Sequence, residues 1–333
     1  MEKRGYSSAV RLHGWNTPGV CGLDNSGNSC YFNAVLQCLC STVPLVEHLL
    51  NKDTHKELCR VAQVFVRLLE EMWLGSSPSC APVEARSVLC SILPQFNNYS
   101  QQDAQELLIF LLNALHDDLK KSQDQNKNCA TAAGESTIVS HLFEGQLSYM
   151  RLCMHCEHQA HSTQSFTVLS LPIPTSTTKC SIQDCLSLFF EQTTLTGGEQ
   201  MLCSVCRQRR ETAVLTCLDK PPEILVLHLK RWVKQHHLFR VTFISHNLDK
   251  QMELCPEWLK GSNHTGSLNM GHYTALCHNT LTRAWHCFDD SAVREVQDNL
   301  VQSPNAYILL YTRKPFQKEK STDVCSFCFH LPS

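Results

Sequence analysis

The pattern of apolar and polar residues predicts a helical first third of the chain. One series of apolar residues spaced three and four apart lies within Tyr31–Leu50, and a second amphipathic segment spans Glu57–Trp73. Both spacings repeat the period of an α-helix with one buried face. The first helix can be capped by Asn28 or Ser29, whose side chains accept hydrogen bonds from the free N–H groups at a helix start.

A third helix is predicted from Ser100 onward. Ser100 and Asp103 fit a capping box, and the apolar positions that follow keep the helical period: Ala104, Leu107, Leu108, Leu111, Leu115 and Leu119. After that helix, residues 121–136 lack large apolar side chains. Such a composition is typical of an exposed, flexible linker.

Beyond residue 136 the pattern changes to short segments of β type. They lie at Phe143–Tyr149, Phe166–Pro172, Ala213–Leu218, Ile224–Trp232, Tyr273–His278 and Ala306–Thr312. Prolines and polar residues separate them, as expected between strands. A helical block followed by a β-rich block predicts an α+β fold, in which a site can form in the cleft between the two lobes.

The composition is that of a folded globular protein, with 43% apolar and 18% charged residues among 333. The net charge of −2 provides no overall field for nucleic acid. No apolar stretch approaches the ~18 residues of a membrane span, and no signal-peptide pattern follows the polar first residues. We therefore expect a monomeric protein of the cytoplasm, the nucleus or both, which binds neither nucleic acid nor a membrane.

Cys30, His272 and Asp289 are the strongest candidates for chemistry. Cys30 follows a Gly- and Asn-rich segment at a predicted helix start, and His272 follows Gly271. Cysteine, then histidine, then aspartate is the order of a papain-like nucleophile system, in which an imidazole oriented by a carboxylate activates the thiol. A helix N-terminus also favours the thiolate. Each residue alone has an ordinary structural explanation, but the combination favours catalysis.

Two Cys-x-x-Cys motifs, Cys153 with Cys156 and Cys203 with Cys206, predict a metal site. Four thiolates match the tetrahedral shell of one structural Zn²⁺, which would brace the fold and have no open position for catalysis. The two motifs are farther apart than in a compact zinc ribbon, so the second must return on a hairpin or sheet. The alternative is two pairs of reduced thiols on strand ends.

The other cysteines are interpreted as reduced thiols, most of them small core residues. The chain has 20 cysteines in all. A third Cys-x-x-Cys pair, Cys325 with Cys328, stands alone near the end of the sequence and is interpreted as unliganded.

Taken together, these segments resemble the ubiquitin-specific protease family over residues 19–314. The motifs that carry the resemblance are GLDNSGNSCYFNAVLQCL around Cys30, QQDAQEL at residues 101–107, GHYTALC from Gly271, Trp285, FDDS at residues 288–291 and AYILLY from Ala306. The length and layout are those of a compact member regarded as inactive.

The resemblance implies a fold with a thumb, a palm and fingers. Residues 19–120 would form the helical thumb and 121–136 a flexible linker. Residues 137–232 would form the fingers, with the zinc knuckles, and part of the palm. Residues 233–314 would form the rest of the palm, with the histidine and the aspartate. Residues 1–18 and 315–333 would be an N-terminal extension and a C-terminal tail.

The resemblance also implies a role for each matched residue at the catalytic centre. Cys30 would be the nucleophile, His272 the base and Asp289 the residue that orients the imidazole. Asn25 would help to form the oxyanion hole, and Asp290 would support that site or the base. The implied reaction is hydrolysis of the isopeptide or peptide bond after the C-terminal glycine of ubiquitin, through a thioester and without a catalytic cofactor.

Ubiquitin or ubiquitinated proteins are the partners that the resemblance implies. Asp103 and Glu106 lie one helical turn apart and suit the arginine-rich tail of ubiquitin. A helix cap explains Asp103 equally well. His264 and Tyr273 match family positions near the substrate tail, although either could merely shape its loop.

The sequence departs from the family pattern just before residues 262–266. An apolar strand is usual there, whereas Leu254–Gly261 contains Pro256 and charged residues without alternation. A shortened palm strand would leave the strand of His272 without ladder partners. The alternative function is therefore a catalytically weak or inactive ubiquitin-binding scaffold. A ubiquitin-like modifier as the substrate is a third possibility.

Overall fold

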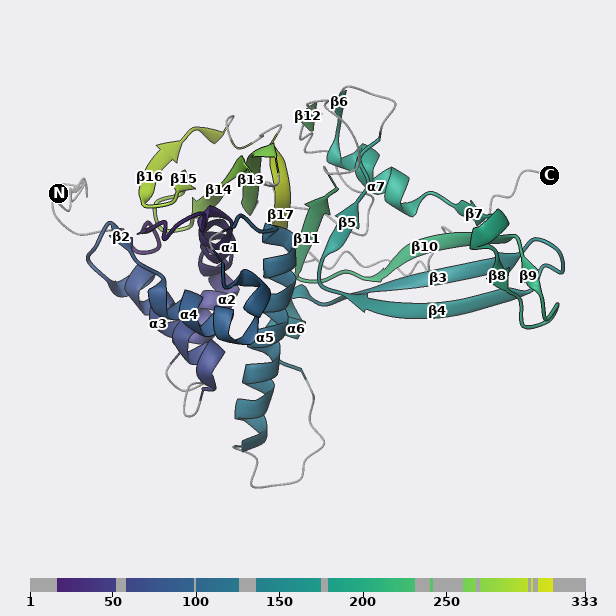
Figure 1. Cartoon of the computed structure of the whole chain (residues 1–333), viewed down its shortest axis with the longest axis horizontal. Helices are drawn as coiled ribbons and strands as arrows, with labels where there is room; N and C mark the ends of the chain where they lie inside the picture. The colour runs from purple at the N-terminus through teal and green to yellow at the C-terminus, as the bar shows by residue number, and fades with distance from the viewer. Residues whose placement is uncertain are drawn as a thin grey trace, which may run out of the picture.

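The structure is a computed structural model, and its described residues are 17–51, 58–98, 100–125, 136–174, 179–230, 240–241, 260–267, 270–298, 301 and 305–313. A helical lobe lies beside a seven-stranded sheet, and a narrower four-stranded sheet extends away from both (Figure 1). The α+β fold class predicted from the sequence is therefore confirmed.

The helical lobe is built around one buried helix. Its helices are α1 (Cys30–Cys40), α2 (Val43–Leu50), α3 (Arg60–Leu74), α4 (Val83–Ile92), α5 (Ala104–Gln125) and α6 (Ile138–Phe143). The short parallel strands β1 (Gly22–Leu23) and β2 (Ser79–Cys80) and the 3₁₀ turn η2 (Pro94–Phe96) complete it. Every residue of α1 is buried, so α1 is the central helix of the lobe.

The segment Tyr31–Leu50 contains two helices and not the predicted single helix. The axes of α1 and α2 differ by 78°. Pro44 lies in the first turn of α2, where its missing N–H costs no hydrogen bond, whereas inside a continuous helix the ring would clash with the preceding turn. No helix among the described residues could by itself cross a membrane, and only α1 and α2 together pass that test of length and composition.

Helix α5 begins and ends later than predicted. It starts at Ala104, and Asp103 Oδ1 accepts the N–H of Gln105 at 2.7 Å. Asp103 therefore caps the helix, and the capping box expected from Ser100 is wrong. The helix continues to Gln125, so the first part of the predicted linker is helical. Residues 126–135 lie outside the described part of the chain.

The large sheet, which we call the palm sheet, covers the helical lobe. Its strand order is β16 (Ala292–Val296), β15 (Ala284–Asp289), β14 (Met270–Asn279), β13 (Lys260–Ser267), β17 (Ala306–Thr312), β11 (Ile224–Leu229) and β5 (Leu169–Leu171). In β17, Ile308 and Leu310 pack on the helical lobe and Leu309 packs on the opposite face. Both faces are thus buried, which explains the nearly continuous apolar sequence of this strand.

The strand of His272 has ladder partners, whereas residues 254–259, where the sequence predicts a shortened strand, lie outside the described residues. Strand β13 lies between β14 and β17, and its Thr265 is paired with His272 and its His264 with Tyr273. The ladder beside His272 is therefore continuous. The described ladder runs from the pair Gly261 and Leu276 to the pair Ser267 and Met270. Pro256 lies outside the described residues.

The narrower sheet forms the fingers. Its strands are, in order, β4 (Gln159–Phe166), β3 (Gly145–Cys153), β10 (Thr212–Lys220) and β7 (Thr193–Leu195). The pair β8 (Met201–Leu202) and β9 (Arg209–Arg210) lies at the far end, after the turn η3 (Gly197–Glu199) (Figure 1). Helix α7 (Ile182–Phe190) and the pair β6 (Lys179–Cys180) and β12 (Arg240–Val241) flank the base.

Gly22 gives the first test of how the two lobes are joined. It lies in β1 against the turn after β15, where Leu23 N donates to Asp290 O at 2.9 Å, and a Cβ at Gly22 would overlap the backbone carbonyl of Ser291. We expect Gly22→Ala to lower the free energy of unfolding by about 2–4 kcal/mol, as other overpacking changes do. Urea denaturation followed by circular dichroism measures this loss.

Gly198→Ala is the matched control, because a Cβ there meets nothing within 4 Å. Its denaturation midpoint should equal that of the wild type. Equal midpoints for the two variants would show that the close approach at Gly22 is not a constraint.

Candidate active site

Cys30 is the first residue of α1 and is only 2% exposed. The chain enters the helix through Gly27 and Asn28, which both have positive φ (88° and 50°). Ser29 occupies the N-cap position, but its hydroxyl makes no capping bond and instead donates to Asn25 Oδ1 at 3.2 Å. The expected side-chain cap by Ser29 is therefore absent, and Asn28 lies one residue before the N-cap position.

Burial raises the pKa of the Cys30 thiol, and the charge of Asp290 raises it further. The backbone N–H of Tyr273 and those at the start of α1 act in the opposite direction. The helix start is expected to lower the pKa of the Cys30 thiol, but burial raises this pKa by more. A nucleophilic sulfur at this position needs a base to take its proton.

His272 and Asp289 form a hydrogen-bonded pair across the palm sheet. His272 Nε2 lies 2.6 Å from Asp289 Oδ1, and the two side chains are 42% and 50% exposed. They come from the neighbouring strands β14 and β15. A carboxylate at Nε2 favours the tautomer with its proton there, which leaves Nδ1 as the proton acceptor.

The thiol faces the strand that carries His272. The N–H of Tyr273, the next residue of β14, points to the sulfur of Cys30. Gln101 Nε2 donates to Cys30 Sγ at 3.8 Å and also to Gly271 O, on the other side of His272. Among the hydrogen bonds of the described residues, none joins thiol and imidazole directly. Such bonds are often long in free enzymes and tighten with substrate.

Asp290 is held by two amides of the helical lobe. Its carboxylate accepts from Asn25 Nδ2 at 2.7 Å and from Asn33 Nδ2 at 2.8 Å. One nitrogen or oxygen atom from each of His272, Asp289 and Asp290 lies within 4.8 Å of the other two. The Asp290 carboxylate therefore lies beside the hydrogen-bonded pair of His272 and Asp289. Asn25 uses one amide hydrogen here, and the second is available for an oxyanion.

The predicted substrate residues differ in their surroundings. Both carboxylate oxygens of Asp103 accept from Tyr307 Oη at 2.8 Å, and Oδ1 also caps α5. These contacts support the role of Asp103 as a helix cap. Glu106 is exposed in the first turn of the same helix. Tyr273 is buried beside Tyr307, with ring centroids 5.9 Å apart. The side chain of His264 lies outside the described atoms, and its role stays a prediction.

Three residues that position the site were not predicted. Asn33 holds Asp290, and Gln101 contacts both Cys30 and Gly271. Arg86, on α4, donates to Ser26 O at 2.9 Å and to Asn98 O at 3.3 Å, which fastens the loop of Asn25. The sequence offered one indication of the role of Asn33. It is a polar residue on a helix that is mostly apolar, and a buried polar side chain needs hydrogen-bond partners.

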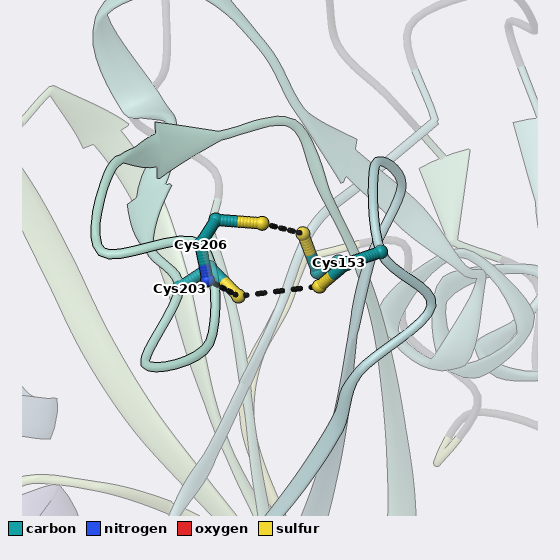
Figure 2. A group of neighbouring side chains, drawn as sticks. Cys153, Cys203 and Cys206 are labelled. Atoms are coloured by element: carbon teal, nitrogen blue, oxygen red, sulfur yellow. Dashed lines mark hydrogen bonds between the residues drawn. The ribbon is translucent and has the colours of Figure 1, made fainter.

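The four predicted cysteine ligands meet at the end of the fingers (Figure 2). Their sulfurs lie within 4.8 Å of one another, with Cys153 and Cys206 3.9 Å apart and Cys156 and Cys203 3.6 Å apart. Thiolates at 2.3 Å around one Zn²⁺ would be about 3.8 Å apart. The cluster therefore has the dimensions of a tetrahedral metal site.

Both cysteine turns have the same backbone. The residue after each second cysteine, Glu157 or Arg207, has positive φ (57° and 52°). Its N–H donates to the carbonyl of the first cysteine, Cys153 or Cys203, at 2.9 and 2.8 Å. The turns lie between β3 and β4 and between β8 and β9, as the wide separation of the two motifs requires.

The family model described as ubiquitin carboxyl-terminal hydrolase matches residues 21–311 of the chain. The chain belongs to this family. Its match contains Cys30, His272 and Asp289 as well as the four clustered cysteines. Members of the ubiquitin carboxyl-terminal hydrolase family are cysteine hydrolases, in agreement with the enzyme class expected from the sequence.

Several members of the family are similar to this chain in sequence. It is 31% identical to the Usp2 ubiquitin carboxyl-terminal hydrolase of Drosophila melanogaster, over 93% of this chain and 36% of the relative. It is also 31% identical to ubiquitin carboxyl-terminal hydrolase 21 of Mus musculus (88% and 61%) and to hydrolase 2 of Homo sapiens (88% and 55%). The chain thus spans between 36% and 61% of the length of these relatives.

Solved structures share the fold. The Ubp8 deubiquitinating module bound to monoubiquitin matches with a TM-score of 0.75 at 22% identity, over 90% of this chain and 70% of the solved chain. The module bound to ubiquitin aldehyde matches with a TM-score of 0.73 at 23% identity and the same coverage.

Asn33 provides a test of the contact that holds Asp290. Asn33→Leu keeps the size of the side chain but removes the amide that donates to Asp290 Oδ1 and to Leu23 O (3.1 Å). We expect the free energy of unfolding to fall by about 2–3 kcal/mol, because buried acceptors lose their donor. Equilibrium denaturation in urea measures the change.

Asn113→Leu makes the same substitution on an exposed position of α5 and should change stability by less than about 0.5 kcal/mol. A similar loss in both variants would mean that the amide of Asn33 contributes nothing specific.

Proposed function

We propose that this chain is a deubiquitinating cysteine peptidase, which hydrolyses the isopeptide or peptide bond after the C-terminal glycine of ubiquitin. The observation that carries the proposal is the pairing of His272 with Asp289 on the strand that faces Cys30. Membership of the ubiquitin carboxyl-terminal hydrolase family supports it. The ubiquitin-bound structures of similar fold support ubiquitin as the partner.

In the proposed reaction, His272 Nδ1 takes the proton of the Cys30 thiol while Asp289 holds the opposite ring nitrogen. The sulfur attacks the glycine carbonyl carbon, and the amine of the leaving group departs with the proton from His272. A water, deprotonated by His272, then attacks the thioester carbonyl. This step releases the ubiquitin carboxylate and restores the thiol, so protons and bonds balance.

The negative oxygen of both intermediates needs donors. The second amide hydrogen of Asn25 and the backbone N–H at the start of α1 can supply them beside Cys30. A single donor of this kind is worth ~3 kcal/mol of transition-state stabilisation in comparable sites. Because Asp290 and Arg86 fix the Asn25 loop, that donor is oriented before substrate binds.

A ubiquitin-binding scaffold with weak or no activity is the second candidate. The raised pKa of Cys30 favours it, as does the lack of a direct thiol–imidazole bond among the described residues. The pairing of β13 with β14 at His272 counts against the loss of ladder partners that motivated this candidate, while the predicted shortening at residues 254–259 lies outside the described residues.

The decisive test of activity is a covalent adduct with a ubiquitin that carries a C-terminal electrophile. We expect the full-length protein to form the adduct and Cys30→Ala to form none, because Cys30 is the thiol that faces the strand of His272. Cys217→Ala, which removes an exposed thiol on β10, should react as the wild type does. Intact-mass spectrometry measures all three.

Failure of the wild type to form the adduct while it still binds ubiquitin would overturn the proposal in favour of the scaffold. An adduct formed only with the electrophile of a ubiquitin-like modifier would instead change the substrate.

We also propose that the cluster of Cys153, Cys156, Cys203 and Cys206 holds a structural Zn²⁺. The tetrahedral spacing of the sulfurs supports this choice, because four thiolates with no open position are typical of structural zinc. The ion would join the two cysteine turns at the tip of the fingers. It would take no part in the chemistry at Cys30.

Zinc analysis tests this second proposal. We expect about one zinc per chain, and we expect Cys206→Ser to lose the metal and to melt at a lower temperature. Elemental analysis and thermal unfolding with and without a strong chelator measure both. A metal-free wild type whose melting temperature the chelator leaves unchanged would contradict the proposal.

We propose a cytoplasmic or nuclear location. The described cysteines form no disulfide, and reduced thiols persist in reducing compartments.

A further inference from the structure

Gln101 joins the helical lobe to the palm sheet at the catalytic centre. It lies in the segment that leads into α5 and is half-buried. Its side-chain oxygen accepts the N–H of Gly271 at 2.7 Å, and its Nε2 donates to the carbonyl of the same residue. The amide therefore pairs with Gly271 as a neighbouring strand would.

The same amide also reaches the sulfur. Gln101 Nε2 lies 3.8 Å from Cys30 Sγ, a distance at which a sulfur accepts a hydrogen bond. A primary amide has two donor hydrogens, and here one serves the Gly271 carbonyl and the other the thiol. The side chain thus contacts the nucleophile and the residue that precedes the base.

This arrangement constrains both partners of the reaction. Gly271 is adjacent to His272, so its pairing with Gln101 limits how far the start of β14 can move. An N–H donor at the sulfur stabilises the thiolate more than the thiol, because hydrogen bonds to charged acceptors are stronger. That contribution opposes the desolvation that the buried position of Cys30 imposes.

We infer that Gln101 is a positioning residue, which sets the distance between Cys30 and the strand of His272 and stabilises the thiolate. The inference rests on the proposed function, since it assigns a role in that same reaction. Gln101 lies in the QQDAQEL motif, but neither that motif nor the His272–Asp289 pair assigns it a role.

The other titratable groups around Cys30 set the background for a test. Asp290 lies after β15, Tyr273 is on β14 and Tyr31 is on α1, and each interacts electrostatically with the thiol. The fourth is the imidazole of His272 on β14, paired with Asp289 on β15. None of these groups changes when Gln101 is replaced by a neutral residue.

The neighbouring residue provides a matched control. Gln102 is half-buried like Gln101, but its amide donates to Asn98 Oδ1 at 3.1 Å, and none of the described hydrogen bonds joins it to Cys30 or Gly271. Gln101→Met and Gln102→Met therefore remove the same chemical group one residue apart, and only the first removes it from the site.

The experiment measures the reactivity of Cys30 without ubiquitin. The full-length protein and each variant are alkylated with iodoacetamide over a neutral to alkaline pH range, and peptide mass spectrometry follows the Cys30 peptide. We expect Gln101→Met to raise the apparent pKa of the thiol and to slow alkylation at neutral pH about threefold to tenfold. Gln102→Met should match the wild type.

Turnover gives the second measurement. With a ubiquitin substrate, kcat of Gln101→Met should fall about tenfold to a hundredfold, because a displacement of about 1 Å in the site has that effect. The fall in kcat should exceed the fall in alkylation rate, since His272 is displaced as well. Gln101→Glu keeps the size of the side chain and the acceptor for the Gly271 N–H but cannot donate to the sulfur. The Cys30 thiol of this variant should therefore react no faster than that of Gln101→Met.

The outcomes are distinct. An unchanged thiol pKa in Gln101→Met, or an equal loss in Gln102→Met, overturns the inference. If Gln101→Met unfolds, Gln101→Leu, which is also neutral and has no donor, decides in the same assay. A wild type that does not hydrolyse ubiquitin refutes the proposed function alone, because alkylation still reports whether Gln101 stabilises the thiolate.

Discussion

The packing of the buried helix α1 on strand β14 is the contact on which the site depends. Cys30 starts the helix and His272 lies on the strand, so the two lobes must dock before a nucleophile and a base can face each other. The contact is deeply apolar, and Cys277 on β14 also donates through its thiol to Gln37 O on α1 at 3.7 Å. Displacement of this interface would separate Cys30 from His272 without changing either residue.

Polar contacts refine what the apolar interface brings together. Asp290, with its left-handed backbone (φ 52°), places its carboxylate between Asn25 and Asn33 of the helical lobe. Gln101, in the segment before α5, holds Gly271, and Arg86, on α4, holds Ser26. Each of these bonds is short-ranged and directional, whereas the hydrophobic effect is not. The apolar core therefore sets the approach of the lobes, and the amides set the geometry of the site.

The sequence predicted those features that are encoded locally. Cys30, His272 and Asp289 lie in short motifs, and β17 has the predicted bounds because apolar residues on both of its faces form one continuous segment. Strand β4 was missed, because its sequence is polar and it pairs only at the edge of β3. Asn33 and Gln101 were missed because their partners lie 257 and 170 residues away, and no local pattern encodes such a contact.

The matching cysteine turns have a consequence for how the tip of the fingers is assembled. Each turn closes on itself, with its own left-handed residue and its own backbone bond to the first cysteine. Two thiols are thereby placed side by side before the distant half of the chain arrives. An ion captured by one half would present open coordination positions to the other. Cation capture can in this way guide the long-range alignment of β3 with β10, in addition to stabilising it afterwards.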